Sequence, residues 1–219
     1  MSTNVMRVGN VEITALVDAE AKVPPAMMFP TLAKEAWDPY CEFLVDDCAN
    51  LPLTIPTFIL RSGGKTILID SGIGAKDRPL FPNGRLPDAL AEAGLRPEQI
   101  DIVFATHIHI DHVGWHTTAK DDGFVPTFPN AVYVFARDEY EFFTSPEVRA
   151  NPEVTWVDDC VMPLVGAAQI GEARMIARPA IARDHQRRRN RDHLLERTRR
   201  EPVPTIEARC EQRQYLAAE

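Results

Sequence analysis

A short polar segment that directly follows an apolar strand constrains this chain more than any other feature. A strand is predicted over Asp101–Thr106, and the next six residues, 107–112, hold three of the chain's six histidines and one aspartate. In an extended segment, residues i and i+2 point to the same side, so His107 and His109 are expected to project together. Ile108 faces the other way and can anchor the segment in a core. The sequence therefore predicts a cluster of imidazoles at the end of a buried strand.

The cluster has the donor atoms of a divalent metal site. Imidazole nitrogens and carboxylate oxygens are suitable ligands for Zn²⁺ and similar cations. Once the chain turns, Asp111 and His112 can reach a second point close to the first, and Gly114 leaves room for that turn. The spacing indicates two neighbouring metal positions, one with His107 and His109 and the other with Asp111 and His112. Packing alone does not explain so many polar groups that are costly to desolvate.

This segment resembles a known family signature. Thr106–Gly114 is similar to the His-x-His-x-Asp-His motif of the metallo-β-lactamase superfamily of binuclear metallohydrolases. Ile67–Gly72 resembles the strand and Asp-Ser/Thr-Gly turn that precede the motif in that family. Gly114-Trp115 and a proline-rich N-terminal loop resemble its lactonase and organophosphate-hydrolase-like branch. The resemblance covers residues 5–170 and implies the N-terminal part of an α+β fold, the αββα sandwich.

The resemblance implies a role for each residue of the motif. His107 and His109 would bind the first metal, and Asp111 and His112 would bind the second. Asp111 would also be the catalytic residue that orients the attacking hydroxide. The implied cofactor is Zn²⁺, two ions in a complete family member, and other divalent metals can replace it.

Two nearby residues have open roles. By the resemblance, Asp70 would be a buried support for the site, but it is also a suitable turn residue to cap the end of its strand. His116 lies a helical turn beyond His112, where it would line the pocket or face solvent.

The implied reaction is metal-assisted hydrolysis of a small ester or lactone. A hydroxide held between two cations forms near neutral pH and attacks the carbonyl carbon. The expected partner is thus a small-molecule substrate, together with a second copy of the chain in a homodimer. The body of the chain is acidic and has no basic face, which argues against nucleic acid. No apolar run approaches the roughly 18–20 residues of a membrane span.

A change in composition near Gly171 divides the chain. Residues 1–170 hold 12 Lys and Arg against 24 Asp and Glu, whereas residues 171–219 hold 12 against 8, and all 12 are arginine. Leu, Ile, Val and Phe supply only 7 of those last 49 residues, which is too few for a packed core. We therefore expect a metallo-β-lactamase-like domain over 1–170 and an Arg-rich tail over 171–219 that is disordered or partly helical.

The tail lacks the remaining ligands of the family site. These are a His in a Gly-His-Thr-type turn, a bridging Asp and a last His, and neither His185 nor His193 stands in such a turn. The tail fits a basic interaction arm, a solvated helix from about Ile181 to Arg200, or translation in a shifted reading frame. The alternative to an active hydrolase is a truncated, inactive remnant with an incomplete metal site, or a weak metal-binding or interaction protein.

The expected location is the cytoplasm. Four cysteines at irregular spacing do not form a disulfide framework, so all four are expected to be thiols in a reducing compartment. Met1 to Ala21 has neither a basic n-region nor a continuous apolar h-region, so we expect no signal peptide.

Alternating and helical patterns predict the elements around the motif. The Gly63-Gly64 pair suits a tight hairpin turn. Strands are expected over 11–17, 57–61, 66–70 and 131–135, and helices over 87–93 and 137–143. Without the second sheet of the sandwich, the inner face of this sheet would leave an apolar patch in water, which favours dimerisation or poor solubility.

Limited proteolysis tests the predicted tail. With so few apolar side chains, residues 171–219 cannot offset their ordering entropy by burial. Trypsin is therefore expected to cut first at the arginines after Arg174, and mass spectrometry of the earliest fragments locates those cuts. Tail arginines that resist cleavage as long as those of the body would contradict the prediction.

Overall fold

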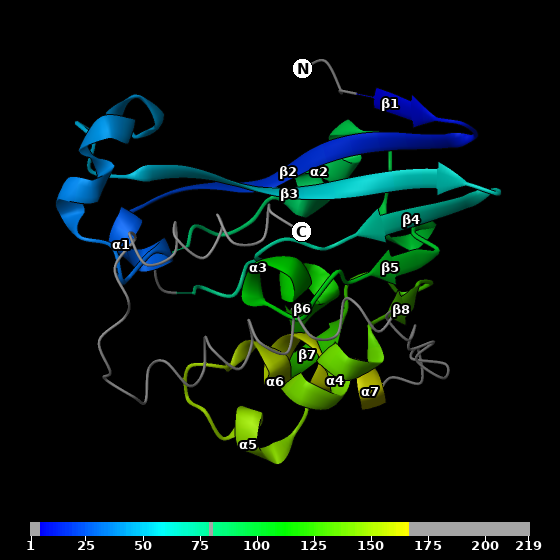
Figure 1. The fold of residues 1–219 in the computed structure, drawn as a ribbon. Coiled ribbons are helices and arrows are strands. Elements are labelled where there is room, and N and C mark those ends of the chain that lie inside the picture. Colours follow the sequence, from blue (N-terminus) through cyan, green and yellow to red (C-terminus); the bar gives the residue numbers. More distant parts are fainter. Residues whose placement is uncertain (1–4, 79–80, 167–219) are drawn as a thin grey trace, which may run out of the picture.

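One mixed sheet forms the framework of the molecule (Figure 1). The computed structural model describes residues 5–78 and 81–166. Neighbours from β1 to β4 are antiparallel, whereas β4, β5 and β8 run parallel. Across the sheet the order is β1 (Val5–Val8), β2 (Val11–Val23), β3 (Leu51–Ser62), β4 (Lys65–Ile69), β5 (Ile102–Phe104) and β8 (Val132–Val134). A separate two-stranded sheet pairs β6 (Thr117–Lys120) with β7 (Gly123–Pro126).

Short helices surround this sheet. In Figure 1, α2 lies behind the long strands β2 and β3, and α4 to α7 gather below the parallel strands. The helices are α1 (Pro25–Met28), η1 (Lys34–Phe43), α2 (Leu86–Glu92), η2 (Pro97–Gln99), α3 (Ile110–Val113), η3 (Gly114–His116), α4 (Arg137–Phe143), α5 (Pro146–Arg149), α6 (Trp156–Cys160) and α7 (Met162–Gly166). Together with the sheets they form the expected α+β fold.

The elements predicted from local patterns are present. The hairpin turns at Gly63 and Gly64, whose φ angles of 56° and 72° are the positive values that a tight turn requires. α4 coincides with the predicted helix 137–143, α2 begins and ends one residue before the predicted helix 87–93, and β8 lies within the predicted strand 131–135. β2 is longer than predicted: after an irregularity between Val17 and Ala19 it continues to pair with β3 as far as Val23.

The main core lies on the face of the sheet that α2 covers. Ile59, Leu68, Val103 and Tyr133 occupy one row across four strands, and each is at most 2% exposed. Leu90 from α2 belongs to the same buried cluster. The alternating residues of these strands therefore form one face of the sheet that is fully buried.

The opposite face of the sheet is also apolar but is not fully covered. Two rows of paired residues form this apolar face: Phe58, Ile69, Phe104 and Val134 in one, and Leu60, Ile67, Ile102 and Val132 in the other. Neither row contains a charged residue. Phe58 is 37% exposed and Val132 is 40% exposed.

The structure contradicts the expectation that all four cysteines are thiols. Cys41 and Cys48 form a disulfide, with 5.0 Å between their Cα atoms, and Cys160 is a buried free thiol. The loop between Val45 and Asn50 closes through a β-bridge and brings the two half-cystines together, which their spacing did not reveal. Disulfides are typical of oxidising compartments, so the cytoplasmic location stays a prediction.

None of the helices within residues 5–78 and 81–166 is long and apolar enough to cross a membrane. The Arg-rich tail predicted over 171–219 lies outside the described residues.

The apolar face generates a prediction about association. We expect the purified chain to dimerise or aggregate, and the double substitution Phe58→Ser and Val132→Ser to weaken association about tenfold or more. Each side chain contributes about 1.5–3 kcal/mol when fully buried. Size-exclusion chromatography with light scattering measures the effect.

Phe43→Ser provides the control, because Phe43 is 64% exposed and lies in η1 rather than on the apolar face. A wild-type chain that remains monomeric at high concentration, or one that responds equally to both sets of substitutions, would refute the assignment of this face.

Candidate metal centre

The ends of β4 and β5 bring the predicted site together. The two strands are parallel neighbours, so Asp70 after β4 and the histidine segment after β5 meet at the same edge of the sheet. Asp70 accepts hydrogen bonds from the Thr106 backbone N–H (2.7 Å) and hydroxyl (2.8 Å). Its φ of 56° turns the chain sharply at that point. Both roles expected of Asp70, strand-end turn and support, therefore have a geometric basis.

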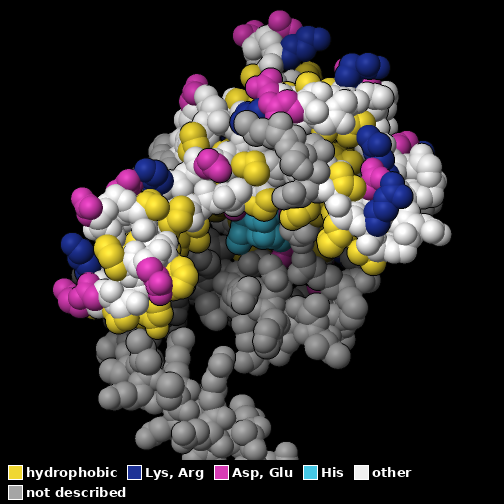
Figure 2. Space-filling model, turned by 90° about the horizontal axis from the view of Figure 1, so that it is seen from above, with side chains coloured by type: hydrophobic (Ala, Val, Ile, Leu, Met, Phe, Trp, Pro, Cys, Tyr) yellow, Lys and Arg dark blue, Asp and Glu magenta, His cyan; other side chains and the backbone are white. Residues whose placement is uncertain are grey.

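The four predicted ligands lie beside Asp70 in one cluster. The Nε2 atom of His107 is 3.0 Å from Nδ1 of His109, so the two rings project together as predicted. The ring centroids of His107 and His112 are 3.9 Å apart. Nδ1 of His112 lies 2.9 Å from Asp70 Oδ2, and its Nε2 lies 3.4 Å from Asp111 Oδ2. Figure 2 shows histidine side chains at the surface, bordered by hydrophobic ones.

The side chains form a hydrogen-bonded cluster rather than a set of converging ligands. Among the residues that the structure describes, no group of three or more His, Cys, Asp or Glu side chains is arranged to hold one metal ion. The donor types fit a divalent cation, because three imidazoles and two carboxylates lie within contact of one another. In the present arrangement their donor atoms pair with one another.

Two side chains from distant helices anchor the histidine segment. The Ile108 backbone N–H donates to Glu139 Oε2 (3.2 Å), and its carbonyl accepts from Trp156 Nε1 (3.1 Å). Ile108 is fully buried, which confirms the predicted anchor. Glu139 in α4 is 3% exposed, and nothing in its local sequence pointed to this contact.

His116 is part of the core. It is fully buried, its Nδ1 lies 2.6 Å from the Ser71 hydroxyl, and its ring packs on Tyr133 and Phe135. The solvent-facing alternative is therefore wrong, because the chain turns inward at η3 rather than continuing along a surface helix. Burial lowers the pKa of His116 to about 3, so the ring is neutral.

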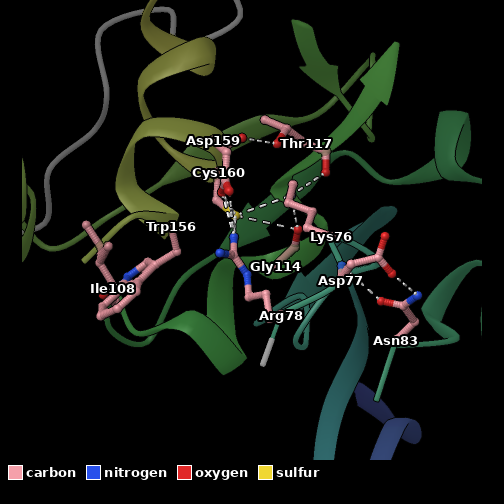
Figure 3. A network of polar contacts seen from close by, with 10 residues as sticks. All are labelled: Lys76, Asp77, Arg78, Asn83, Ile108, Gly114, Thr117, Trp156, Asp159 and Cys160. Atoms are coloured by element: carbon pink, nitrogen blue, oxygen red, sulfur yellow. Dashed lines mark hydrogen bonds and ion pairs between the residues drawn. The ribbon is translucent and has the colours of Figure 1, made fainter. Parts of the chain in front are cut away.

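A partly buried polar network lies beside the site on the side of α6 (Figure 3). The Lys76 ammonium donates to the carbonyls of Gly114 (2.5 Å) and Thr117 (2.9 Å) and to Cys160 Sγ (3.2 Å). Arg78 pairs with Asp159 at 2.6 Å, with side-chain exposures of only 8% and 19%. Burial raises the pKa of the Cys160 thiol to about 12, so the thiol is protonated within this network.

The histidines of the cluster have opposite electrostatic environments. Burial, together with the charges of His112 and His109, lowers the pKa of His107 to about 4. Burial also acts to lower the pKa of His112, but hydrogen bonds and charges from Asp111 and Asp70 outweigh it and raise the pKa to about 9. In the metal-free protein at neutral pH, His107 is therefore neutral and His112 is protonated.

Comparison with family models identifies the chain. The model of the metallo-β-lactamase superfamily matches residues 51–200, which include every residue of the cluster. The chain belongs to the metallo-β-lactamase superfamily. The match extends beyond Gly171, and the domain boundary placed at 170/171 stays a prediction.

Solved structures share the fold. A probable metal-dependent hydrolase from Staphylococcus aureus is 24% identical, with a TM-score of 0.57, over 70% of this chain and 56% of that one. AidC, a dizinc quorum-quenching lactonase, is 20% identical, with a TM-score of 0.59, over 78% and 60%. The hydrolase AbOPH of the β-lactamase superfamily is 27% identical, with a TM-score of 0.52, over 84% and 59%.

The chain thus spans less than two thirds of the length of these three proteins. The comparison with curated proteins finds no match.

The shifted pKa values predict how the metal-free protein responds to pH. The lowered pKa values of His107 and His116 make stability rise as pH increases from about 3 to 6.5. The raised pKa of His112 gives stability that is complete below about 6.5 and lost as pH rises to about 9. Urea unfolding in the presence of a chelator should therefore show maximal stability near pH 6.5.

The variant His112→Gln tests the loss of stability expected between pH 6.5 and 9, because glutamine does not titrate. The variant should be less stable at pH 6.5 but should lose little further stability up to pH 9. A wild-type profile that is flat between pH 7 and 9 would contradict the assignment.

Proposed function

We propose that the chain carries the N-terminal half of a hydrolytic metal centre. In this proposal His107 and His109 bind one divalent cation, Zn²⁺ in the first instance, and Asp111 and His112 contribute to a second position. The observation that carries the proposal is the clustering of all four side chains with Asp70 at one edge of the sheet. A bound cation would supply a Lewis acid and lower the pKa of a coordinated water.

The residues of the cluster would each contribute differently to such a reaction. The Asp111 side chain is 39% exposed, so it can orient a water molecule that enters from solvent. Asp70 holds Nδ1 of His112 at 2.9 Å, so a cation would bind at Nε2, which now faces Asp111 and would have to lose its proton first. His107 is neutral at pH 7 and needs to lose no proton before it binds a metal.

The proposed substrate is a small ester or lactone. AidC is a dizinc lactonase whose structure contains the product N-hexanoyl-L-homoserine, and it shares this fold. A lactone carbonyl is a suitable electrophile for metal-activated hydroxide. The partners proposed for the chain are therefore such a substrate and a second copy of itself.

A second candidate function is weak metal binding without efficient turnover. One observation favours it: among the described residues, no three donors converge on one point. His185 and His193 do not stand in the turn that the resemblance requires, and they lie outside the described residues.

Zinc binding distinguishes the proposed ligands from other histidines. We expect the wild-type chain to bind Zn²⁺ more weakly than a complete binuclear site, because water fills the open positions. His107→Ala and His109→Ala should each weaken binding at least tenfold, whereas His185→Ala and His193→Ala are matched controls with little effect. Isothermal titration calorimetry measures the affinities, and equal binding by all four variants would refute the assignment.

Turnover separates the two candidate functions. Hydrolysis of an activated ester and of an acyl homoserine lactone is measured with added Zn²⁺. Activity that His109→Ala abolishes supports the hydrolase. Zinc binding with turnover at background supports the second candidate, and this is the outcome we expect of the chain as it stands.

A further inference from the structure

A fully buried carboxylate lies beside the site and was not singled out from the sequence. Asp18 is in β2, at the irregularity between Val17 and Ala19 that interrupts its pairing with β3. Its Oδ2 accepts the Ile73 backbone N–H at 2.7 Å. Its Oδ1 accepts the Leu86 backbone N–H at 2.7 Å and the Trp115 indole N–H at 2.8 Å. One carboxylate thus joins three segments that are distant in the sequence.

Glycines allow the backbone to pack directly on this carboxylate. A Cβ atom on Gly72 or on Gly84 would overlap the carboxylate of Asp18. Gly72 also has a φ of 64°, which disfavours other residues at the same position. The Arg85 N–H donates to the Asp18 carbonyl at 2.8 Å, which adds a backbone contact to the same junction. The surroundings of Asp18 therefore have little freedom to accommodate another side chain.

The segments held by Asp18 are those that join the two halves of the candidate site. The Ile73 segment continues from Asp70, and the Trp115 segment continues from His112. Between them, the Ser71 N–H donates to the His112 carbonyl (2.7 Å) and the Trp115 N–H donates to the Ser71 carbonyl (3.0 Å). The Gly114 N–H donates to the Gly72 carbonyl at 2.7 Å. Asp18 thus lies behind a short set of backbone bonds that sets Asp70 against His112.

We propose that Asp18 is a positioning residue of the metal centre. Its carboxylate fixes the segment of Asp70 against the segment of His112, and so sets the orientation of the His112 ring toward a cation. This inference rests on the proposed function for its effect on metal binding, but not for its effect on the two segments.

The chemistry of the junction requires a carboxylate. Three N–H groups point at Asp18, and a carboxylate has acceptor sites for all of them on two oxygens. An amide of the same shape has one oxygen, so its NH₂ group would face at least one of these donors. Asp18→Asn therefore leaves a buried N–H unsatisfied while changing the volume of the side chain little.

Hydrogen exchange on the metal-free full chain tests the positioning role. In Asp18→Asn, we expect at least tenfold faster amide exchange at Ile73 and Leu86, and also at Ser71 and Gly114, whose N–H groups donate to other residues than Asp18. Amides in the β3–β4 ladder should be unchanged. Faster exchange confined to Ile73 and Leu86 would overturn the proposal, because it would show only a local structural role.

Asp101→Asn is the matched control. Asp101 also accepts a backbone N–H, from Thr66 at 2.8 Å, but it precedes β5 and so lies at the opposite edge of the sheet. This variant should leave the exchange of Ser71 and Gly114 as in the wild type. Equal acceleration by both variants would overturn the proposal.

If Asp18→Asn does not fold, the variant Trp115→Phe provides the same test. It retains an aromatic ring and removes one of the three donors, so it should accelerate exchange at the same four amides to a smaller extent. Unchanged exchange at Ser71 and Gly114 in this folded variant would likewise overturn the proposal.

The affinity for Co²⁺ and the visible spectrum of bound Co²⁺ provide a second test, which a general loss of stability does not affect. With circular dichroism unchanged, Asp18→Asn should weaken Co²⁺ binding at least tenfold and alter its visible spectrum, whereas Asp101→Asn should do neither. An unaltered spectrum and affinity in Asp18→Asn would overturn the proposal. A wild-type chain that binds no Co²⁺ would refute the proposed function instead, and hydrogen exchange would still decide the role of Asp18.

Discussion

The contact between Asp70 and the segment after β5 is the interaction on which the site depends. Parallel pairing of β4 and β5 brings the two strand ends together, but the pairing alone does not orient the side chains beyond them. Asp70 does so by accepting hydrogen bonds from Thr106 and by holding His112 at 2.9 Å. Buried, charge-assisted hydrogen bonds of this kind are among the stronger polar interactions in proteins. The Asp70 carboxylate therefore links the strand pairing of the family fold to the residues of the candidate metal site.

Three further side chains hold the segments on either side of that contact. Glu139 and Trp156 hold Ile108 from the helical side, while Asp18 holds the segments of Ile73 and Trp115 from the side of β2. The hydrogen bonds of these groups hold the segments on either side of the cluster, which is how a rigid scaffold presents polar side chains at a strand edge. Removing any of them is expected to change the geometry of the cluster before it changes the chemistry.

Local patterns predicted what depends on a few neighbouring residues. The Gly63-Gly64 turn and the common direction of His107 and His109 follow from conformational preferences within the segment itself, and both are present. The burial of Ile108 followed from the same alternation.

Contacts between distant segments could not be predicted in this way. Asp18 and Glu139 stand in ordinary strand and helix contexts, and only the tertiary structure shows what they accept. The burial of His116 depends on a kink at Trp115 that turns the chain into the core, and no periodic pattern marked it. The Cys41–Cys48 disulfide likewise depends on how a loop closes. Local patterns thus indicated the donors of the site but not the groups that support them.

The backbone at Asp70 has a consequence for attempts to stabilise this protein. Its φ of 56° lies in the left-handed region, which glycine adopts without steric cost and other residues adopt less readily. Glycine at this position would relieve that backbone cost, but it would also remove the carboxylate that joins the two strand ends, together with its hydrogen bonds to Thr106 and His112. The backbone conformation and the side-chain contacts of Asp70 therefore place opposite demands on this position, and a substitution chosen for backbone geometry alone would sacrifice the contact between the two strand ends.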